Sequence, residues 1–218
     1  FAADLSIFND TKDSENTSYL LHRGIELSKE KRERLVTIHA WCLMGNHYHL
    51  LLSENDESGM SEFLKKFNGG YARYFNKKHN RSGALFQGKT KRVLIENDRQ
   101  FLYILPYIHL NPLDFLKGAR EWRSQWLANP KAAIKWISDY HWSSYRNYMG
   151  EKEFAEILEG SELFADRMEH VNELKRFLNT EPEASPSSLS LEWLTDSYRC
   201  RTTIEIVFLR YADWMSAH

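Results

Sequence analysis

Residues 46–52 read NHYHLLL, with polar residues ahead of a run of leucines, and we expect them to form a β-strand. Successive side chains of a strand point to opposite faces. His47 and His49 would therefore share one face, and Tyr48 would point to the other, toward a core. Residues 35–43 include consecutive β-branched residues and also predict a strand. Because only a short Met-Gly-Asn connection separates the two strands, we expect them to form a hairpin.

Apolar residues recur at helical spacing in three other parts of the chain. Residues 60–78 predict an amphipathic helix, and residues 18–34 predict a helix ahead of the hairpin. A third helix is expected to begin near residue 98 and to stop near Asn111-Pro112, with Pro106 kinking or restarting it. Between the last two helices, residues 84–96 alternate basic and apolar side chains and predict another strand.

The order helix, strand, strand, helix, strand, helix predicts an α+β fold. With one strand ahead of the first helix it would be ferredoxin-like, an antiparallel sheet with helices on one face. After Gly150 the chain changes character, because residues 151–178 are acidic with a helical pattern and residues 179–190 form a Pro/Ser linker. We therefore expect one domain over residues 1–150 and a helical C-terminal extension over residues 151–218.

The composition is that of an ordinary globular chain. Of its 218 residues, 42% are hydrophobic and 27% are charged, which allows a full core. No apolar run approaches the roughly 20 residues that a membrane helix requires, so we expect no membrane contact. Two distant cysteines without a CxxC spacing indicate a reducing compartment such as the cytoplasm, and no zinc-thiolate site.

The distribution of charge points to nucleic acid, although the net charge of −1 argues against a protein that coats it. No acidic residue occurs between Phe63 and Arg92, and aromatic residues are interleaved with the basic ones. A solvated face normally mixes both signs, whereas a run of one sign with aromatics is typical of a surface that binds phosphates and bases. The predicted DNA-binding residues are Lys65, Lys66, Arg73, Lys77, Lys78, Arg81, Gln87, Lys89, Lys91 and Arg92.

Histidine is the commonest metal ligand among side chains, and two imidazoles on one face of a rigid strand can converge on one divalent cation. The spacing of His47 and His49 is equally compatible with two half-buried strand histidines. The other histidines are easier to interpret. His39 lies on the preceding strand and is expected to pack, and His109 is expected to be structural or to contact DNA.

Four segments of the chain together resemble a known family. They read LMGNHYHLLL at residues 43–52, YARYFNKKHNRSGALFQGK at 71–89, YIHLNPL at 107–113 and WSSYRNYMG at 142–150. In these segments the chain resembles the single-tyrosine HUH transposases, most closely the REP-associated tyrosine transposase branch. The resemblance implies a ferredoxin-like nuclease fold in a bacterial, nucleoid-associated protein. It also implies that the protein, a monomer or a homodimer, cuts single-stranded DNA at hairpin-flanked sites.

The resemblance also implies roles for particular residues. On the matching positions, His47 and His49 would be the metal-binding pair and Tyr107 the nucleophile. Asn111 would complete the metal site, and its i, i+4 spacing from Tyr107 would place both side chains on one helix face. Mg²⁺ or Mn²⁺ suits a site of imidazole and oxygen ligands with open positions. A phenol has a pKa of about 10, so at neutral pH it is a poor nucleophile unless the metal site activates the reaction. Attack by Tyr107 would leave a 5′-phosphotyrosine and a free 3′-OH.

Several alternatives stay open. Tyr103 lies one helical turn before Tyr107 and is the best rival nucleophile. A domesticated relative would bind hairpin DNA or RNA without cutting it, and a hydrolase using water would not need Tyr107. The chain also departs from the family, since Gly45 stands where Pro is frequent. The family's first strand is not recognisable before residue 10, so it either precedes Phe1 or is missing.

Overall fold

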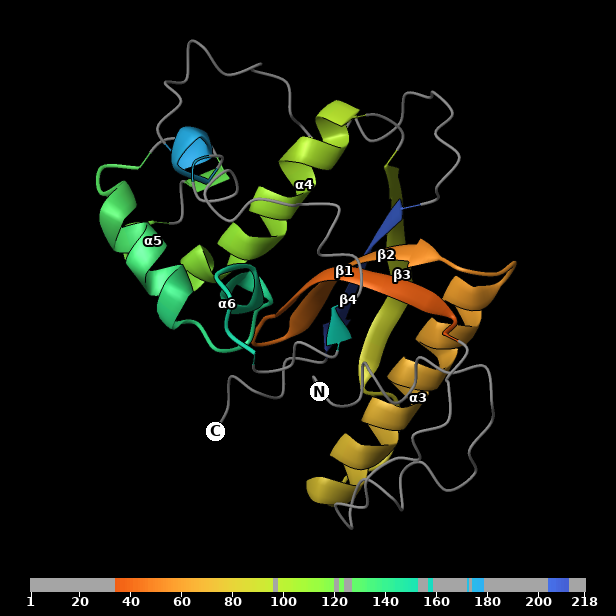
Figure 1. Cartoon of the computed structure of the whole chain (residues 1–218). Helices are drawn as coiled ribbons and strands as arrows, with labels where there is room; N and C mark the ends of the chain where they lie inside the picture. Colours follow the sequence, from red (N-terminus) through yellow and green to blue (C-terminus); the bar gives the residue numbers. More distant parts are fainter. Residues whose placement is uncertain are drawn as a thin grey trace.

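The computed structural model describes residues 34–95, 98–119, 122, 123, 127–152, 157, 158, 172, 174–178 and 204–211. The predicted helix over residues 18–34 and the predicted linker over residues 179–190 lie outside this part of the chain. In the part that the structure describes, the chain forms an α+β fold with a small antiparallel sheet packed against helices, as the order of predicted elements indicates (Figure 1).

Four strands make up the sheet. They are β1 (Val36–Leu43), β2 (His47–Glu54), β3 (Phe86–Ile95) and β4 (Ile204–Tyr211). Their order is β1-β2-β4-β3, and every neighbouring pair is antiparallel. The predicted hairpin of β1 and β2 is confirmed, with Leu43 opposite Tyr48 beside the turn.

The inner strand β4 comes from the far end of the chain and corrects one prediction. We expected a helical extension after residue 150, but Ile204–Tyr211 forms a strand between β2 and β3. This segment is rich in β-branched and aromatic residues, which favour an extended backbone. The helical part of the extension that the structure describes includes residues 174–178. The sheet therefore draws on both sides of the predicted domain boundary.

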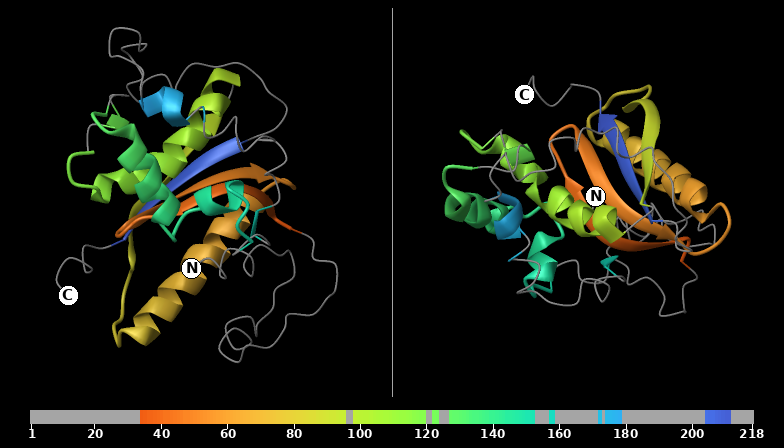
Figure 2. Two further views of the ribbon diagram at one scale, coloured as in Figure 1. Left: turned by 60° about the vertical axis from the view of Figure 1, so that its left-hand side comes forward. Right: turned by 90° about the horizontal axis from the view of Figure 1, so that it is seen from above.

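The two main helices lie on opposite faces of the sheet (Figure 2). Helix α3 (Gly59–Lys78) places Phe63 and Phe67 in one core cluster with Leu50 of β2. Helix α4 (Asp98–Leu110) packs instead in a second cluster with Leu51, the next residue of β2. The prediction of helices on one face is therefore wrong. Leu50 and Leu51 point to opposite faces and both are buried, so each face of the sheet needs a cover.

A third apolar cluster forms beyond α4. A 3₁₀ turn, η1 (Asn111–Phe115), continues α4, which runs through Pro106 without ending there. Helices α5 (Pro130–Asp139) and α6 (Tyr145–Tyr148) follow, and the fully buried Trp122 belongs to the cluster. Among the residues that the structure describes, no helix combines the length and the apolar character that a membrane crossing requires.

Two glycines of α3 should respond oppositely to alanine. A Cβ on Gly59 would lie 2.3 Å from the carbonyl oxygen of Leu35, so Gly59→Ala forces a backbone shift. It should lower the free energy of unfolding by about 1–3 kcal/mol. A Cβ on Gly69 meets nothing within 4 Å, so Gly69→Ala should raise that free energy by about 0.5–1 kcal/mol. Urea unfolding followed by circular dichroism measures both, and equal effects would contradict the close approach at Gly59.

Candidate active site

The two histidines of β2 lie on the sheet face that α4 covers. Their ring centroids are 4.9 Å apart with an interplanar angle of 73°. His49 is 3% exposed, and burial lowers its pKa well below the usual value, helped by the nearby charges of His47 and Arg123. His49 is therefore neutral at neutral pH, which is the form that can bind a metal ion.

His47 is held by its neighbour. A hydrogen bond joins His47 Nδ1 and Asn46 Oδ1 at 2.7 Å. With the amide oxygen as acceptor, Nδ1 carries the proton and Nε2 is the nitrogen with a lone pair. The bond fixes the orientation of the ring as well as its tautomer, and this is how metal-binding histidines are commonly supported.

Tyr107 lies beside this pair. Its ring centroid is 6.1 Å from that of His49, in an edge-to-face arrangement, although α4 and β2 are far apart in the sequence. Tyr107 is half-buried and stacks on Tyr103 at 5.9 Å. Burial raises the pKa of Tyr103 to about 12, with a contribution from Tyr107, so the Tyr103 phenol is harder to ionise than a free phenol. The structure thus brings the predicted nucleophile next to the histidine strand and makes its rival less suitable.

Asn111 is buried, and both ends of its amide are engaged. Its Nδ2 donates a hydrogen bond of 2.8 Å to the carbonyl oxygen of Tyr107, one helical turn earlier. Its Oδ1 accepts a hydrogen bond of 3.1 Å from Nη2 of Arg123. An amide oxygen has two lone pairs, so this contact leaves one for another ligand. The side chain is thereby fixed on the Tyr107 side of the helix, and its role as a metal ligand stays a prediction.

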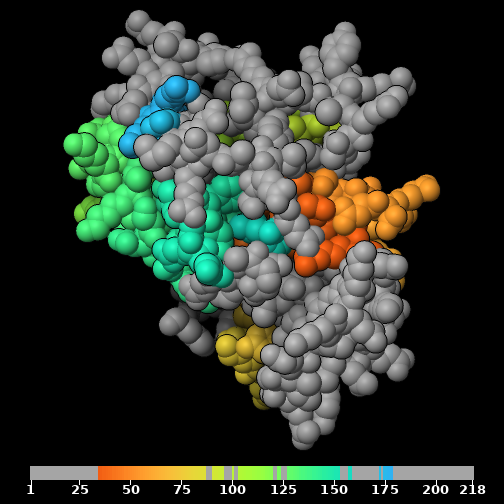
Figure 3. Space-filling model, viewed as in Figure 1, coloured from red at the N-terminus to blue at the C-terminus, as the bar shows by residue number. Residues whose placement is uncertain are grey.

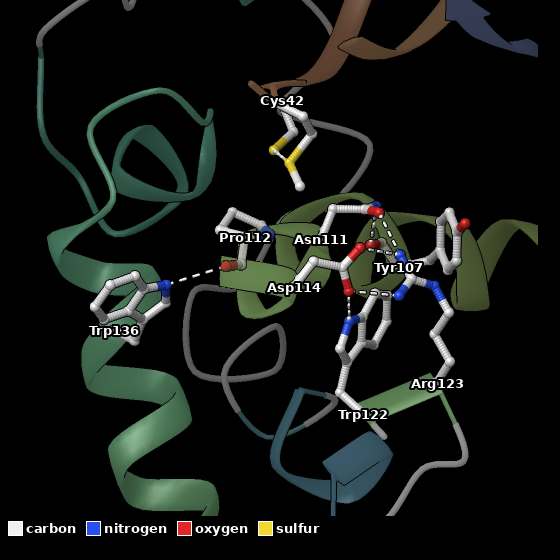
Figure 4. A network of polar contacts seen from close by, with 9 residues as sticks. Cys42, Tyr107, Asn111, Pro112, Asp114, Trp122, Arg123 and Trp136 are labelled. Atoms are coloured by element: carbon white, nitrogen blue, oxygen red, sulfur yellow. Dashed lines mark hydrogen bonds and ion pairs between the residues drawn. The ribbon is translucent and has the colours of Figure 1, made fainter. Parts of the chain in front are cut away.

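Arg123 and Asp114 form a polar network around Asn111 that the sequence did not reveal (Figure 4). Nη2 of Arg123 donates to Oδ2 of Asp114 at 2.7 Å, and the indole nitrogen of Trp122 donates to Oδ1 at 2.8 Å. The guanidinium also lies over the Trp122 ring, 4.4 Å from its centroid. Burial alone would raise the pKa of Asp114, but the hydrogen bonds from Arg123 and Trp122 hold it below the usual value. The carboxylate is therefore ionised and anchors Arg123.

The WSSY block connects β1, the hairpin partner of the histidine strand, to the tyrosine helix. Ser144 Oγ accepts a hydrogen bond of 2.9 Å from the backbone N–H of Trp41 in β1, and it lies 2.8 Å from Nε2 of His109 in α4. On the surface, residues 141–150 (teal) lie beside the hairpin (orange) in Figure 3. His109 is fully buried, which confirms its structural interpretation. His39 is also buried, with Nε2 2.8 Å from Ser53 Oγ, and it packs as predicted.

Most of the predicted DNA-binding side chains lie on or beside α3, away from Tyr107. Lys65, Arg73, Lys77 and Lys78 of this helix are exposed. Two further members have partners within the protein: Lys66 forms an ion pair of 2.9 Å with Glu62, and Arg81 donates to the carbonyl oxygen of Ala84 at 3.2 Å. Because α3 and α4 cover opposite faces of the sheet, this basic surface is separated from the histidines.

The predicted residues of β3 are divided between the two faces. Arg92 points toward α3, where Nη2 lies 3.5 Å from Ser61 Oγ. Lys91 is exposed and pairs in register with Phe208, which pairs in turn with His49. Residues in one cross-strand row share a face, so Lys91 belongs to the face of the histidines. The side chains of Gln87 and Lys89 lie outside the part that the structure describes.

The side chains fit a divalent ion by their chemistry. Within the described ranges, no cluster of three His, Cys, Asp or Glu residues could hold a metal. The predicted set differs from such a cluster, since it consists of the imidazoles of His47 and His49 and the amide oxygen of Asn111. Two neutral nitrogen ligands and one oxygen ligand leave open positions, and Mn²⁺ or Mg²⁺ accepts such a set with water or phosphate as further ligands.

Residues 18–111 match the model of the family described as "Transposase IS200 like". No curated protein and no solved structure matches the chain. The matched segment contains both histidines, Tyr107 and Asn111, and it ends before Asp114 and Arg123. The match does not distinguish the REP-associated branch from the rest of the family. Through residues 18–111 the chain is therefore similar to the IS200-like transposases, and this similarity points to a DNA endonuclease of the transposase type.

Proposed function

We propose that this protein nicks and rejoins single-stranded DNA at hairpin-flanked sites through a 5′-phosphotyrosine on Tyr107. The observation that carries the proposal is the placement of Tyr107 beside His49, at 6.1 Å between ring centroids. The family match supports action on DNA. The WSSYRNYMG segment lies outside the matched residues and supports the REP-associated branch. We place the protein in the bacterial cytoplasm, associated with the nucleoid, as a monomer or homodimer.

The strand order supports a ferredoxin-like sheet. In that fold the first strand lies between the third and fourth strands and is antiparallel to both. Here β4 has this position and direction, between β2 and β3. We propose that Ile204–Tyr211 takes the place of the first strand of the family pattern. The order of elements then follows that pattern from the hairpin to β3, and α4 is an addition on the other face.

The proposed chemistry is an exchange of phosphodiester bonds. The Tyr107 hydroxyl attacks the phosphorus, a Tyr–O–P bond forms and the P–O3′ bond breaks. The phenolic proton leaves Tyr107, and the departing 3′ oxygen takes up a proton. His47, His49 and Asn111 would hold a divalent ion, which when bound stabilises charge on the phosphate oxygens. The same 3′-OH, or another one, reverses the step, so strand transfer needs no external energy source.

A covalent trapping assay tests the proposal. The full chain is incubated with a single-stranded hairpin oligonucleotide and Mn²⁺, and the products are separated under denaturing conditions. A protein–DNA band that resists denaturation is the expected result. Binding without cleavage would instead favour the domesticated DNA- or RNA-binding protein. Cleavage without a covalent band would favour a hydrolase that uses water.

The basic surface of α3 should contribute to DNA affinity by binding phosphates. Lys77→Gln combined with Lys78→Gln should weaken binding of a single-stranded oligonucleotide. The slope of log K against log salt concentration should become shallower by about 1.4, or about 0.7 for each lysine that no longer neutralises a phosphate. Fluorescence anisotropy at several salt concentrations measures this slope. Lys131 and Lys135 of α5 are also exposed and provide the matched control, whose neutralisation should leave the slope unchanged.

A further inference from the structure

Arg123 combines a fixed position with access to solvent. Asp114 accepts hydrogen bonds from both terminal nitrogens of Arg123, and the guanidinium lies 4.4 Å from the centroid of the Trp122 ring. The side chain nevertheless remains 42% exposed. An ion pair this exposed adds little to stability, so stability does not account for so well-held an arginine. A planar cation that is held in place and open to solvent is suited to binding a phosphate.

The guanidinium lies among the residues of the candidate site. It donates a hydrogen bond to Asn111 Oδ1 at 3.1 Å and packs on Trp122, whose ring centroid is 5.6 Å from that of Tyr107. Its charge also acts on His49. One cation is thus in reach of the proposed nucleophile, the proposed oxygen ligand and the buried histidine.

The position of the attacked phosphate follows from the position of the Tyr107 hydroxyl. In-line attack requires the phosphorus to lie about 3–3.5 Å from the attacking oxygen. Because Arg123 packs on Trp122, which lies against the Tyr107 ring, a phosphate at that distance brings its non-bridging oxygens close to the guanidinium (Figure 4). We propose that Arg123 is a catalytic residue that donates hydrogen bonds to a non-bridging oxygen of the scissile phosphate. Asp114 is its positioning residue.

This inference rests on the proposed function, because it takes Tyr107 as the nucleophile. It adds a residue from outside the segment that matches the family. Positive charge at the phosphate offsets the charge that develops on its oxygens as the Tyr–O–P bond forms. Arg123 would supply this charge from the helix side, while the histidines lie on the strand side.

The test compares charged and neutral phosphates one position at a time. The full chain with Tyr107→Phe binds a hairpin oligonucleotide without cutting it. A series of such oligonucleotides carries a single methylphosphonate, which removes one negative charge, at successive positions. Arg123→Gln should weaken binding of the unmodified oligonucleotide about tenfold or more. With the methylphosphonate at the phosphate that Arg123 contacts, Arg123→Gln should change affinity less than about twofold. For the unmodified oligonucleotide, Arg123→Lys should retain part of the affinity that Arg123→Gln loses.

Arg73→Gln on the exposed face of α3 is the matched control. The loss of affinity that it causes should be the same for every methylphosphonate position, except at the phosphates that Arg73 contacts. The thermal unfolding midpoint of Arg123→Gln shows that the variant is folded. If Arg123→Gln weakens binding equally at all methylphosphonate positions, or not at all, the inference is overturned. Arg123→Gln can lose its effect at one methylphosphonate position while the wild-type chain forms no covalent band. In that case the proposed function fails and Arg123 remains a phosphate-binding residue.

Discussion

Tyr107→Phe is expected to abolish the covalent protein–DNA band, with a loss of cleavage of at least about a thousandfold. The substitution removes only the phenolic oxygen, which is the atom that would bond to phosphorus. The ring keeps its stacking partners Tyr103 and Trp122, at centroid distances of 5.9 and 5.6 Å. The fold and the affinity for the uncleaved oligonucleotide should therefore be preserved. Denaturing electrophoresis of the products and anisotropy of the complex measure the two quantities separately.

Tyr103→Phe is the matched control. Tyr103 belongs to the same ring stack and lies one turn earlier on the same helix, and its pKa is raised to about 12, mainly by burial. Loss of its hydroxyl should leave the covalent band at a level close to that of the wild-type protein. Full cleavage by Tyr107→Phe would contradict the assignment of the nucleophile. Loss of cleavage in Tyr103→Phe alone would transfer the role to Tyr103.

Replacing both histidines of β2 should have the second largest effect. His47→Gln combined with His49→Gln removes the two nitrogen ligands, so Mn²⁺ binding should fall by at least about a hundredfold, together with cleavage. Glutamine keeps most of the side-chain volume, which matters because His49 is buried against Tyr107. Titration with Mn²⁺ followed by electron paramagnetic resonance measures binding directly, without depending on the reaction.

His39→Gln provides the comparison for a buried histidine that is not a ligand. His39 lies on β1, next to the histidine strand, and is paired with Ser53 at 2.8 Å. Its replacement should change stability and leave Mn²⁺ binding unchanged. Unaltered Mn²⁺ binding in the variant that lacks both His47 and His49 would show that the ion binds elsewhere. The imidazoles would then be part of the packing between β2 and α4.

The elements that carry the candidate site could be predicted because they depend on local periodicity. Residues two positions apart on an extended backbone share a face, so the spacing placed His47 and His49 on one face before any contact was known. The spacing of Tyr107 and Asn111 is likewise local, and the hydrogen bond from Asn111 Nδ2 to the Tyr107 carbonyl oxygen places Asn111 one turn later, where η1 continues α4.

Features that depend on contacts between distant segments could not be predicted in this way. The run of leucines at the end of β2 is compatible with one buried face or with two, so the sequence did not show that α4 covers the second. Arg123 lies in a segment without periodicity, and its meeting with Asn111 depends on the 3₁₀ turn that follows α4. Ser144 and His109 are 35 residues apart and are joined only by the folding of residues 140–148 onto the hairpin.

The position of the basic helix relative to Tyr107 has a consequence for the choice of substrate. A single straight piece of DNA cannot contact both α3 and Tyr107, because the sheet lies between them (Figure 2). In the proposed complex the strand has to pass around an edge of the sheet, and the thickness of the folded layers sets the length of that path. The protein would then measure a distance in nucleotides from the segment held at α3 to the bond that is cut. Target selection would depend on spacing as well as on bases, so inserting one nucleotide into this interval would move the cut by one nucleotide along the strand.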